Sequence, residues 1–242
     1  MAKQPTRSST PRLSEVARHL VVPEGAVTTA WPSVAAKSKQ LGIEYDSWQH
    51  GIGRAALSKR EGGLYAAGIG GVVLSIPRQV GKTFLLAGTV FSLCLLNPGT
   101  TVVWTAHRAR TAAETFTKMQ AFANRAKIKP HIANVVLGSG DEAIIFANGS
   151  RILFGARERG FGRGFDKVDV IVFDEAQILT ENAIDDMVPA ANAAPNGLVF
   201  YVGTPPKPKD PSEVFGQKRR EALSGEDRDT LYVEFSAERG CD

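Results

Sequence analysis

The chain has 242 residues, of which 43% are hydrophobic, and its formal net charge is +4. This is enough apolar material for the core of one large domain, or of one domain with a small appendage. The mild positive charge is compatible with nucleic-acid binding but not diagnostic of it. The polar N-terminus has no signal-peptide pattern, and the longest apolar run, residues 84–96, is too short to span a bilayer. We therefore expect a cytoplasmic protein in which residues 84–96 form a buried helix that contains Cys94 as a core thiol.

The N-terminal part of the chain is predicted to be mostly irregular. Residues 1–10 are polar, basic and low in complexity, which indicates a disordered tail. A short helix is expected over residues 14–20, followed by an irregular stretch to about residue 43. A second helix is then expected over residues 47–60, with Ser47 as its capping residue.

Gln49 in this second helix is a candidate for adenine recognition. Its amide both donates and accepts hydrogen bonds, so it can bind both polar positions on the edge of adenine, and it shortly precedes the next strand. A purely structural glutamine is the alternative.

A phosphate-binding loop is predicted between an apolar strand, residues 72–76, and the helix that Gly81-Lys82-Thr83 opens. Backbone N–H groups of such a loop and the positive end of the helix dipole bind an anion. We expect Lys82 to contact the β- and γ-phosphates of a nucleotide and the Thr83 hydroxyl to bind Mg²⁺. The alternative is that Gly-Lys-Thr follows this strand by chance.

The loop departs from the common pattern at one position. Ile76 stands where a glycine is usual, so the loop itself is Pro77-Arg78-Gln79-Val80. The departure places a cation, Arg78, beside the expected phosphates.

The middle of the chain is predicted to add a strand, a helix and a hairpin. Residues 101–105 have the β-branched and aromatic composition of a buried strand. The amphipathic helix that follows carries Ala112, Phe116, Met119 and Ala123 on one face, which indicates a core face. Two short β-rich runs, 143–147 and 151–154, flank Asn148-Gly149, a hairpin signal in which both central positions favour positive φ.

A loop rich in glycine and arginine, residues 155–164, follows the hairpin. Arg157, Arg159 and Arg163 in this loop are candidates for an arginine supplied to the phosphates of a neighbouring subunit. A solvated flexible loop is the alternative for each of them.

Two further strands end in polar residues. The apolar strand 168–173 ends in Asp174 and Glu175, the Walker B pattern, in which Asp174 would hold Mg²⁺ and Glu175 would polarise the attacking water. Two adjacent acids at the end of a buried strand are costly unless a metal ion or water requires them. Strand 198–203 ends at Thr204, which either relays hydrolysis to moving parts or forms a plain turn. A helix over residues 211–223 and a strand over 230–235 are expected to complete the chain.

Gln49, the Arg78–Thr83 loop, Asp174-Glu175 and Gly203-Thr204, in this order, resemble the large terminase subunit of tailed bacteriophages, the ATPase that drives DNA into the capsid. The Arg-Gln-x-Gly-Lys-Thr form of the loop is the most specific part, and the resemblance covers residues 45–206. It implies a RecA/ASCE-like P-loop NTPase, an α/β fold with a mostly parallel central sheet flanked by helices and a small β-hairpin insertion. ATP and Mg²⁺ are the implied cofactors.

The resemblance also implies roles and partners. Arg78 would be the loop arginine, Arg163 the arginine that acts in trans and Thr204 the coupling residue. Double-stranded DNA, further copies of the chain in a ring, the portal protein and the small terminase subunit would be its partners, in the cytoplasm of the host cell. We expect an N-terminal tail and short helix (1–43), an ATPase core (44–206) and the end of the ATPase domain (207–242), without the nuclease domain of such proteins.

Two other functions remain open from the sequence. Asp174-Glu175-Ala176-Gln177 also suits a helicase-like superfamily 2 ATPase, although such enzymes need a second RecA-like domain. A nucleotide-binding assembly module without useful turnover is the other possibility.

Overall fold

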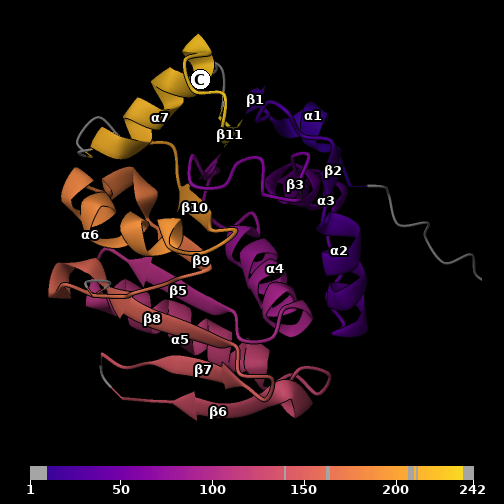
Figure 1. Ribbon diagram of the computed structural model, residues 1–242, viewed down its shortest axis with the longest axis vertical. Helices are drawn as coiled ribbons and strands as arrows, with labels where there is room; N and C mark the ends of the chain where they lie inside the picture. The colour runs from indigo at the N-terminus through magenta and orange to yellow at the C-terminus, as the bar shows by residue number, and fades with distance from the viewer. Residues whose placement is uncertain (1–9, 139, 162–163, 207–209, 211, 237–242) are drawn as a thin grey trace, which may run out of the picture.

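The computed structural model describes residues 10–138, 140–161, 164–206, 210 and 212–236. These residues form a mixed α/β fold in three layers, in which a large, mostly parallel sheet lies between two layers of helices (Figure 1). The predicted fold class is thereby confirmed. Residues 1–9 of the predicted tail lie outside the described residues.

The sheet of the described residues has nine strands. In spatial order they are β1 (His19–Val21), β11 (Leu231–Glu234), β4 (Val72–Ser75), β10 (Leu198–Gly203), β9 (Val170–Asp174), β5 (Thr101–Ala106), β8 (Arg151–Ala156), β7 (Ala143–Phe146) and β6 (Ile132–Val136). The strands from β11 to β8 are parallel to one another, and β1, β7 and β6 are antiparallel to their neighbours. Strand β10 therefore separates β4, which leads into the predicted phosphate loop, from β9, which ends in Asp174.

Alternate residues of the central strands belong to two cores, one on each face of the sheet, as the pleat requires. Val72 and Leu74 belong to one core and Val73 to the other. The first core is covered by α2 (Trp31–Gln40), α3 (Ser47–Ala56), α4 (Lys82–Leu96) and α5 (Ala109–Ala123), and the second by α6 (Glu181–Asn192) and α7 (Glu213–Ser224). In Figure 1, α6 and α7 lie to the left of the sheet and α2, α3 and α4 to the right. Because both faces are covered, the strands are continuous apolar runs.

Helix α4 is buried along most of its length. Every residue from Leu85 to Cys94 is buried, so the apolar run reflects its place between α2 and the sheet. Cys94 is fully buried, which confirms a core cysteine, and burial raises the pKa of its thiol. None of the helices in the described part of the chain has the length and apolar character needed to cross a membrane.

The predicted hairpin forms, but its turn and its size differ from the prediction. Gly149 has φ +84°, whereas Asn148 is not among the described non-glycine residues with positive φ. The N–H of Gly149 donates to the carbonyl of Phe146, so the turn closes one residue earlier than a two-residue loop over Asn148-Gly149 would. Such a turn needs only one residue in the left-handed conformation. Strand β6, preceded by a short 3₁₀ turn at Lys129–His131, adds a third antiparallel strand that the sequence analysis missed.

The N-terminal segment is more regular than expected. The predicted helix over residues 14–20 is wrong: α1 spans only Leu13–Val16, and the following residues form β1 because they pair with β11. The predicted irregular stretch contains β2 (Thr28–Thr29), which pairs with β3 (Ser58–Lys59), and the ten-residue helix α2. Pro32 lies in the first turn of α2, where its missing N–H costs no helical hydrogen bond.

Three further boundaries differ from the predictions. Helix α3 ends at Ala56, and Asp46 rather than Ser47 precedes its first turn as the capping residue. Helix α6, between β9 and β10, was not predicted. Helix α7 (Glu213–Ser224) and strand β11 match the predicted C-terminal helix and strand within two residues, and the core face of α5 is buried as predicted.

Candidate active site

The loop between β4 and α4 has the backbone of a tight anion-binding turn. Gln79 (φ +63°) and Gly81 (φ +97°) are both left-handed, and they flank the exposed Val80. A left-handed Gln is uncommon and strains the backbone, whereas glycine adopts this conformation freely. Gly81 caps α4, so the loop ends at the N-terminus of a fifteen-residue buried helix. Pro77, Arg78 and Gln79 are exposed in this loop.

Lys82, the first residue of α4, folds back over the loop. Its ammonium donates to the carbonyls of Ile76 (2.5 Å) and Pro77 (2.6 Å). Burial lowers its pKa to about 8, the carboxylate of Asp174 opposes this change, and Arg78 adds to it. The ammonium is thus a partly desolvated cation, and an anion in the loop would stabilise it. Thr83 is the next residue of the helix.

Gln49 lies against the loop from the side of α3. Its side-chain oxygen accepts the N–H of Asp46 (2.9 Å), and its side-chain nitrogen donates to the carbonyl of Gly81 (3.3 Å). Both ends of the amide are therefore bound to backbone, and the side chain is 3% exposed. The structure thus gives Gln49 structural contacts with Asp46 and with Gly81 of the loop, and its role in adenine recognition stays a prediction.

The two acids at the end of β9 are held in different ways. Burial and the neighbouring Glu175 raise the pKa of Asp174, against hydrogen bonding from the N–H of Glu175. Glu175 has φ +54°, which turns its side chain away from the strand. Its carboxylate accepts the N–H of His107 (3.3 Å) and the hydroxyl of Thr111 (3.4 Å), at the start of α5. Sequence reasoning missed both partners, since neither residue carries a motif.

Arg157 is also part of this site, within its own subunit. Its guanidinium donates to the carbonyls of Thr105 (3.0 Å) and Asp174 (2.9 Å). It therefore differs from Arg159, which is exposed, and from Arg163, which lies outside the described residues. The parallel pairing of β8 with β5, which brings Arg157 here, has no signature in the sequence.

Thr204 follows β10 and contacts the segment after Glu175. Its N–H donates to the side-chain oxygen of Gln177 (3.2 Å), which is buried in the short 3₁₀ turn η3 (Ala176–Ile178). The ends of β9 and β10 are therefore connected through one glutamine.

The oxygen donors near the loop suit a magnesium ion held together with a nucleotide. The Thr83 hydroxyl and the Asp174 carboxylate are hard ligands of the kind Mg²⁺ takes alongside phosphate oxygens. In the described part of the chain, no three His, Cys, Asp or Glu side chains group closely enough to hold a metal by themselves. The raised pKa of Asp174 marks a carboxylate that a nearby cation would stabilise.

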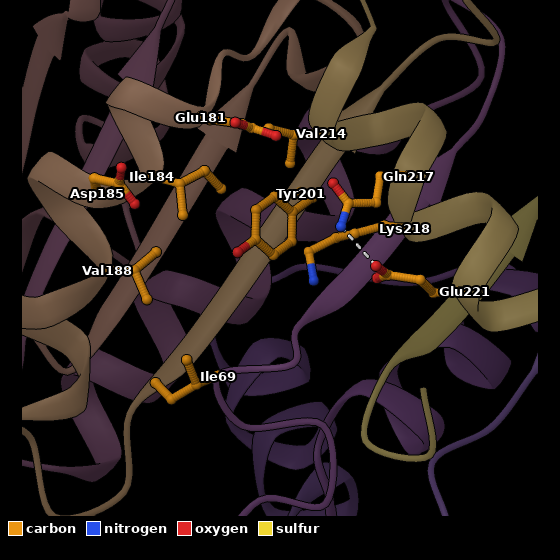
Figure 2. Close-up of a pocket in the computed structure, with 10 residues that line it drawn as sticks. All are labelled: Ile69, Glu181, Ile184, Asp185, Val188, Tyr201, Val214, Gln217, Lys218 and Glu221. Atoms are coloured by element: carbon orange, nitrogen blue, oxygen red, sulfur yellow. Dashed lines mark hydrogen bonds between the residues drawn. The ribbon is translucent and has the colours of Figure 1, made fainter. Parts of the chain in front are cut away.

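A separate pocket of about 360 Å³ lies between α6 and α7 (Figure 2). Its floor is Tyr201 of β10, and Ile184 and Val188 form one wall. Lys218 donates to the carbonyl of Gly70 (2.7 Å) and lies over the ring of Tyr201, so its ammonium has structural partners. None of the predicted site residues lines this pocket.

Comparison with known proteins defines the class of this fold and site. Residues 73–210 match the family described as terminase large subunit, T4likevirus-type, N-terminal. This match covers more than half of the chain, and it includes the phosphate loop, Asp174-Glu175 and Thr204. The chain belongs to this family of phage terminase large subunits, as the sequence predicted.

Solved structures agree with the fold. The large terminase of bacteriophage HK97 is similar with a TM-score of 0.72 at 19% identity, over 88% of this chain and 45% of that one. The ATPase domain of the Thermus phage P74-26 large terminase gives 0.53 at 18% identity, over 70% and 68%. The large terminase of a thermophilic bacteriophage, solved with ADP, gives 0.52 at 12% identity, over 69% and 40%. This chain thus spans less than half of the HK97 protein, and no curated protein sequence matches it.

Proposed function

We propose that this chain hydrolyses ATP and that hydrolysis drives double-stranded DNA into a viral procapsid. Family membership supports the packaging role. The observation that carries the ATPase assignment is the placement of Lys82 and Asp174 at the same edge of the sheet, after β4 and at the end of β9, with β10 between them. The carboxylate of Asp174 favours the charged form of Lys82 there. A large terminase of similar fold was solved in complex with ADP, which supports nucleotide binding by this chain.

In the proposed reaction, water attacks the γ-phosphate of ATP. The loop N–H groups and Lys82 bind the β- and γ-phosphates, and Lys82 leaves the carbonyls of Ile76 and Pro77 to do so. Thr83 and Asp174 hold Mg²⁺, which neutralises phosphate charge when bound. Glu175 orients the water and accepts its proton, while His107 and Thr111 keep that carboxylate in place.

Other proposed roles follow from the family resemblance. Arg78 contacts phosphate from the loop, and Gln49 recognises adenine or supports Gly81. Arg163 acts in trans in a ring of identical subunits, with Arg159 as its rival. Thr204 transmits the state of the site through Gln177. The portal protein and the small terminase subunit are the proposed assembly partners, in the host cytoplasm.

The test is phosphate release from Mg·ATP per protomer over a wide range of protein concentration. Glu175→Gln is the inactivating variant, and Glu114→Gln is the matched control, because Glu114 is exposed on α5 and forms an ion pair with the exposed Arg110. A rate that rises with concentration, survives Glu114→Gln and vanishes in Glu175→Gln is expected for a site completed by a neighbour. Tight ATP binding with a phosphate release that Glu175→Gln leaves unchanged would contradict the proposal and favour an assembly module. Separation of a tailed duplex would favour a helicase.

A further inference from the structure

Arg157 occupies a position that links three strands of the sheet. It directly follows β8, which pairs with β5, and β5 pairs with β9. Its two terminal nitrogens bind carbonyls at the ends of two other strands: Nη1 binds that of Thr105, next to last in β5, and Nη2 binds that of Asp174, the last of β9. The guanidinium also lies 6.0 Å from the ring centre of Phe173, which precedes Asp174. The planar fork of arginine suits two acceptors held side by side in this way.

The charge of Arg157 is matched to the acids of the site. Burial lowers its pKa to about 10, while Glu175 and Asp174 oppose that change. A buried cation without compensation is strongly unfavourable, and the same is true of two adjacent buried carboxylates. Arg157 therefore stabilises the charged form of Asp174, and both acids in turn stabilise the Arg157 guanidinium.

The next residue holds Glu175 indirectly. The carboxylate of Glu158 accepts the N–H of Ala109 (2.8 Å), and the N–H of Glu158 donates to the carbonyl of His107 (3.2 Å). These bonds fix His107 and the first turn of α5, and His107 and Thr111 in turn bind the carboxylate of Glu175. Residues 157 and 158 thus hold the acidic pair through two independent sets of contacts.

We propose that Arg157 is a positioning residue for ATP hydrolysis: it fixes the end of β9 so that Glu175 faces the attacking water, and it makes the segment Arg157–Arg159 a mechanical link to that carboxylate. The inference rests on the proposed function. It also gives the segment Arg157–Arg159 a role within its own subunit. If a neighbouring subunit displaced the exposed Arg159, the movement would be transmitted through Arg157 to Asp174 and Glu175.

The first experiment compares turnover with nucleotide affinity. Arg157→Ala is expected to lower kcat by about 10–100-fold, the usual effect of losing a supporting partner of this kind, with the Kd for ADP unchanged. Arg157→Lys should be intermediate, since one ammonium cannot reproduce the two-pronged contact. Millimolar guanidinium should restore part of the turnover of Arg157→Ala but none of that of Glu175→Gln. Arg220→Ala, which removes an exposed arginine of α7, is the control.

The second experiment needs no turnover. Hydrogen–deuterium exchange of the nucleotide-free chain should become faster in Arg157→Ala at residues 105–111 and 173–177, with α7 unaffected. If Arg157→Ala does not fold, the same measurement on Arg157→Lys tests the inference. The same segments should exchange faster in that variant than in the wild-type chain.

The outcomes separate the two proposals. A wild-type chain that hydrolyses ATP beside a folded Arg157 variant with wild-type kcat and wild-type exchange would overturn the inference and leave the proposed function intact. A wild-type chain without turnover would count against the proposed function. In that case, faster hydrogen exchange in the folded Arg157 variant would support the positioning role of Arg157, and unchanged exchange would overturn it.

Discussion

The N–H of Thr204 and the side-chain oxygen of Gln177 are hydrogen-bonded at 3.2 Å, although 27 residues separate them along the chain. Gly203, which precedes Thr204, is what makes this contact possible. A Cβ at Gly203 would lie 2.7 Å from the side-chain oxygen of Gln177 and 3.0 Å from its backbone nitrogen. The contact between the ends of β9 and β10 therefore depends on the absence of a side chain at one position.

Gly203→Ala should destabilise the chain by about 1–3 kcal/mol, the usual cost of overpacking a filled site. Urea unfolding measures the change. Gly216→Ala is the matched control, because Gly216 lies inside α7 and a Cβ there would meet nothing closer than 3.6 Å. That substitution should stabilise by about 0.5–1 kcal/mol, since alanine is the better helix former. Equal effects of the two substitutions on the free energy of unfolding would contradict the close packing of Gly203 against Gln177.

Gly81→Ala should weaken nucleotide binding as well as stability. A non-glycine residue at φ +97° costs about 1–2 kcal/mol, and the new Cβ would lie 3.0 Å from the side-chain nitrogen of Gln49. Gly149→Ala is the comparison, since it has a similar φ of +84° in open space on the hairpin. Thermal unfolding should show similar losses for both variants, and titration with ADP should show weaker binding only for Gly81→Ala. Weakened binding in both would argue against a specific role of the loop.

Nucleotide binding should take up a proton in mildly alkaline solution. Burial lowers the pKa of Lys82 to about 8, so above that pH most nucleotide-free chains carry a neutral amine. A bound polyphosphate favours the ammonium and raises the pKa, so affinity should fall as the pH rises above about 8. Calorimetry at pH 8.5 in two buffers of different ionisation enthalpy measures the uptake. Lys82→Met should abolish the proton uptake. Binding heats of the wild-type chain that do not depend on the buffer would contradict the prediction.

Glu234 should contribute pH-dependent stability. Burial alone would raise its pKa, but hydrogen bonds from Arg219, Tyr232 and Ser236 more than offset this and hold it at about 2, against an ordinary 4.5. A lowered carboxyl pKa stabilises the fold above pH 4.5, and that contribution is lost as the pH falls toward 2. Glu234→Gln should therefore be less stable than wild type at pH 7, with the difference shrinking at pH 3. Urea unfolding at both values tests this, and a constant difference would contradict it.

The parts of the fold that were predictable are those encoded by local composition. The strands β4, β5, β9 and β10 are buried on both faces, so each appears as an uninterrupted apolar run. The loop before α4 and the acids at the end of β9 lie where the sequence analysis placed them, and their roles in binding phosphate and metal stay predictions. Family membership followed from the order of these motifs.

The rest depended on contacts between distant segments. Residues 19–21 form a strand because β11 lies beside them, and nothing local distinguishes them from the end of a helix. Arg157 appeared equivalent to Arg159, because their difference lies in the pairing of β8 with β5. Glu175 is held by a backbone N–H at His107, which no sequence pattern records.

The insertion of β10 between β4 and β9 sets the width of the active site. Neighbouring strands are about 4.8 Å apart, so the axes of β4 and β9 are separated by about 10 Å rather than by one spacing. Adjacent strands would bring an ammonium and a carboxylate into direct contact, and the two charges would neutralise each other. Across two spacings, Lys82 instead binds the carbonyls of its own loop. The intervening strand thus separates the two strand ends by about the distance that a terminal phosphate and its hydrated cation would need in the proposed reaction.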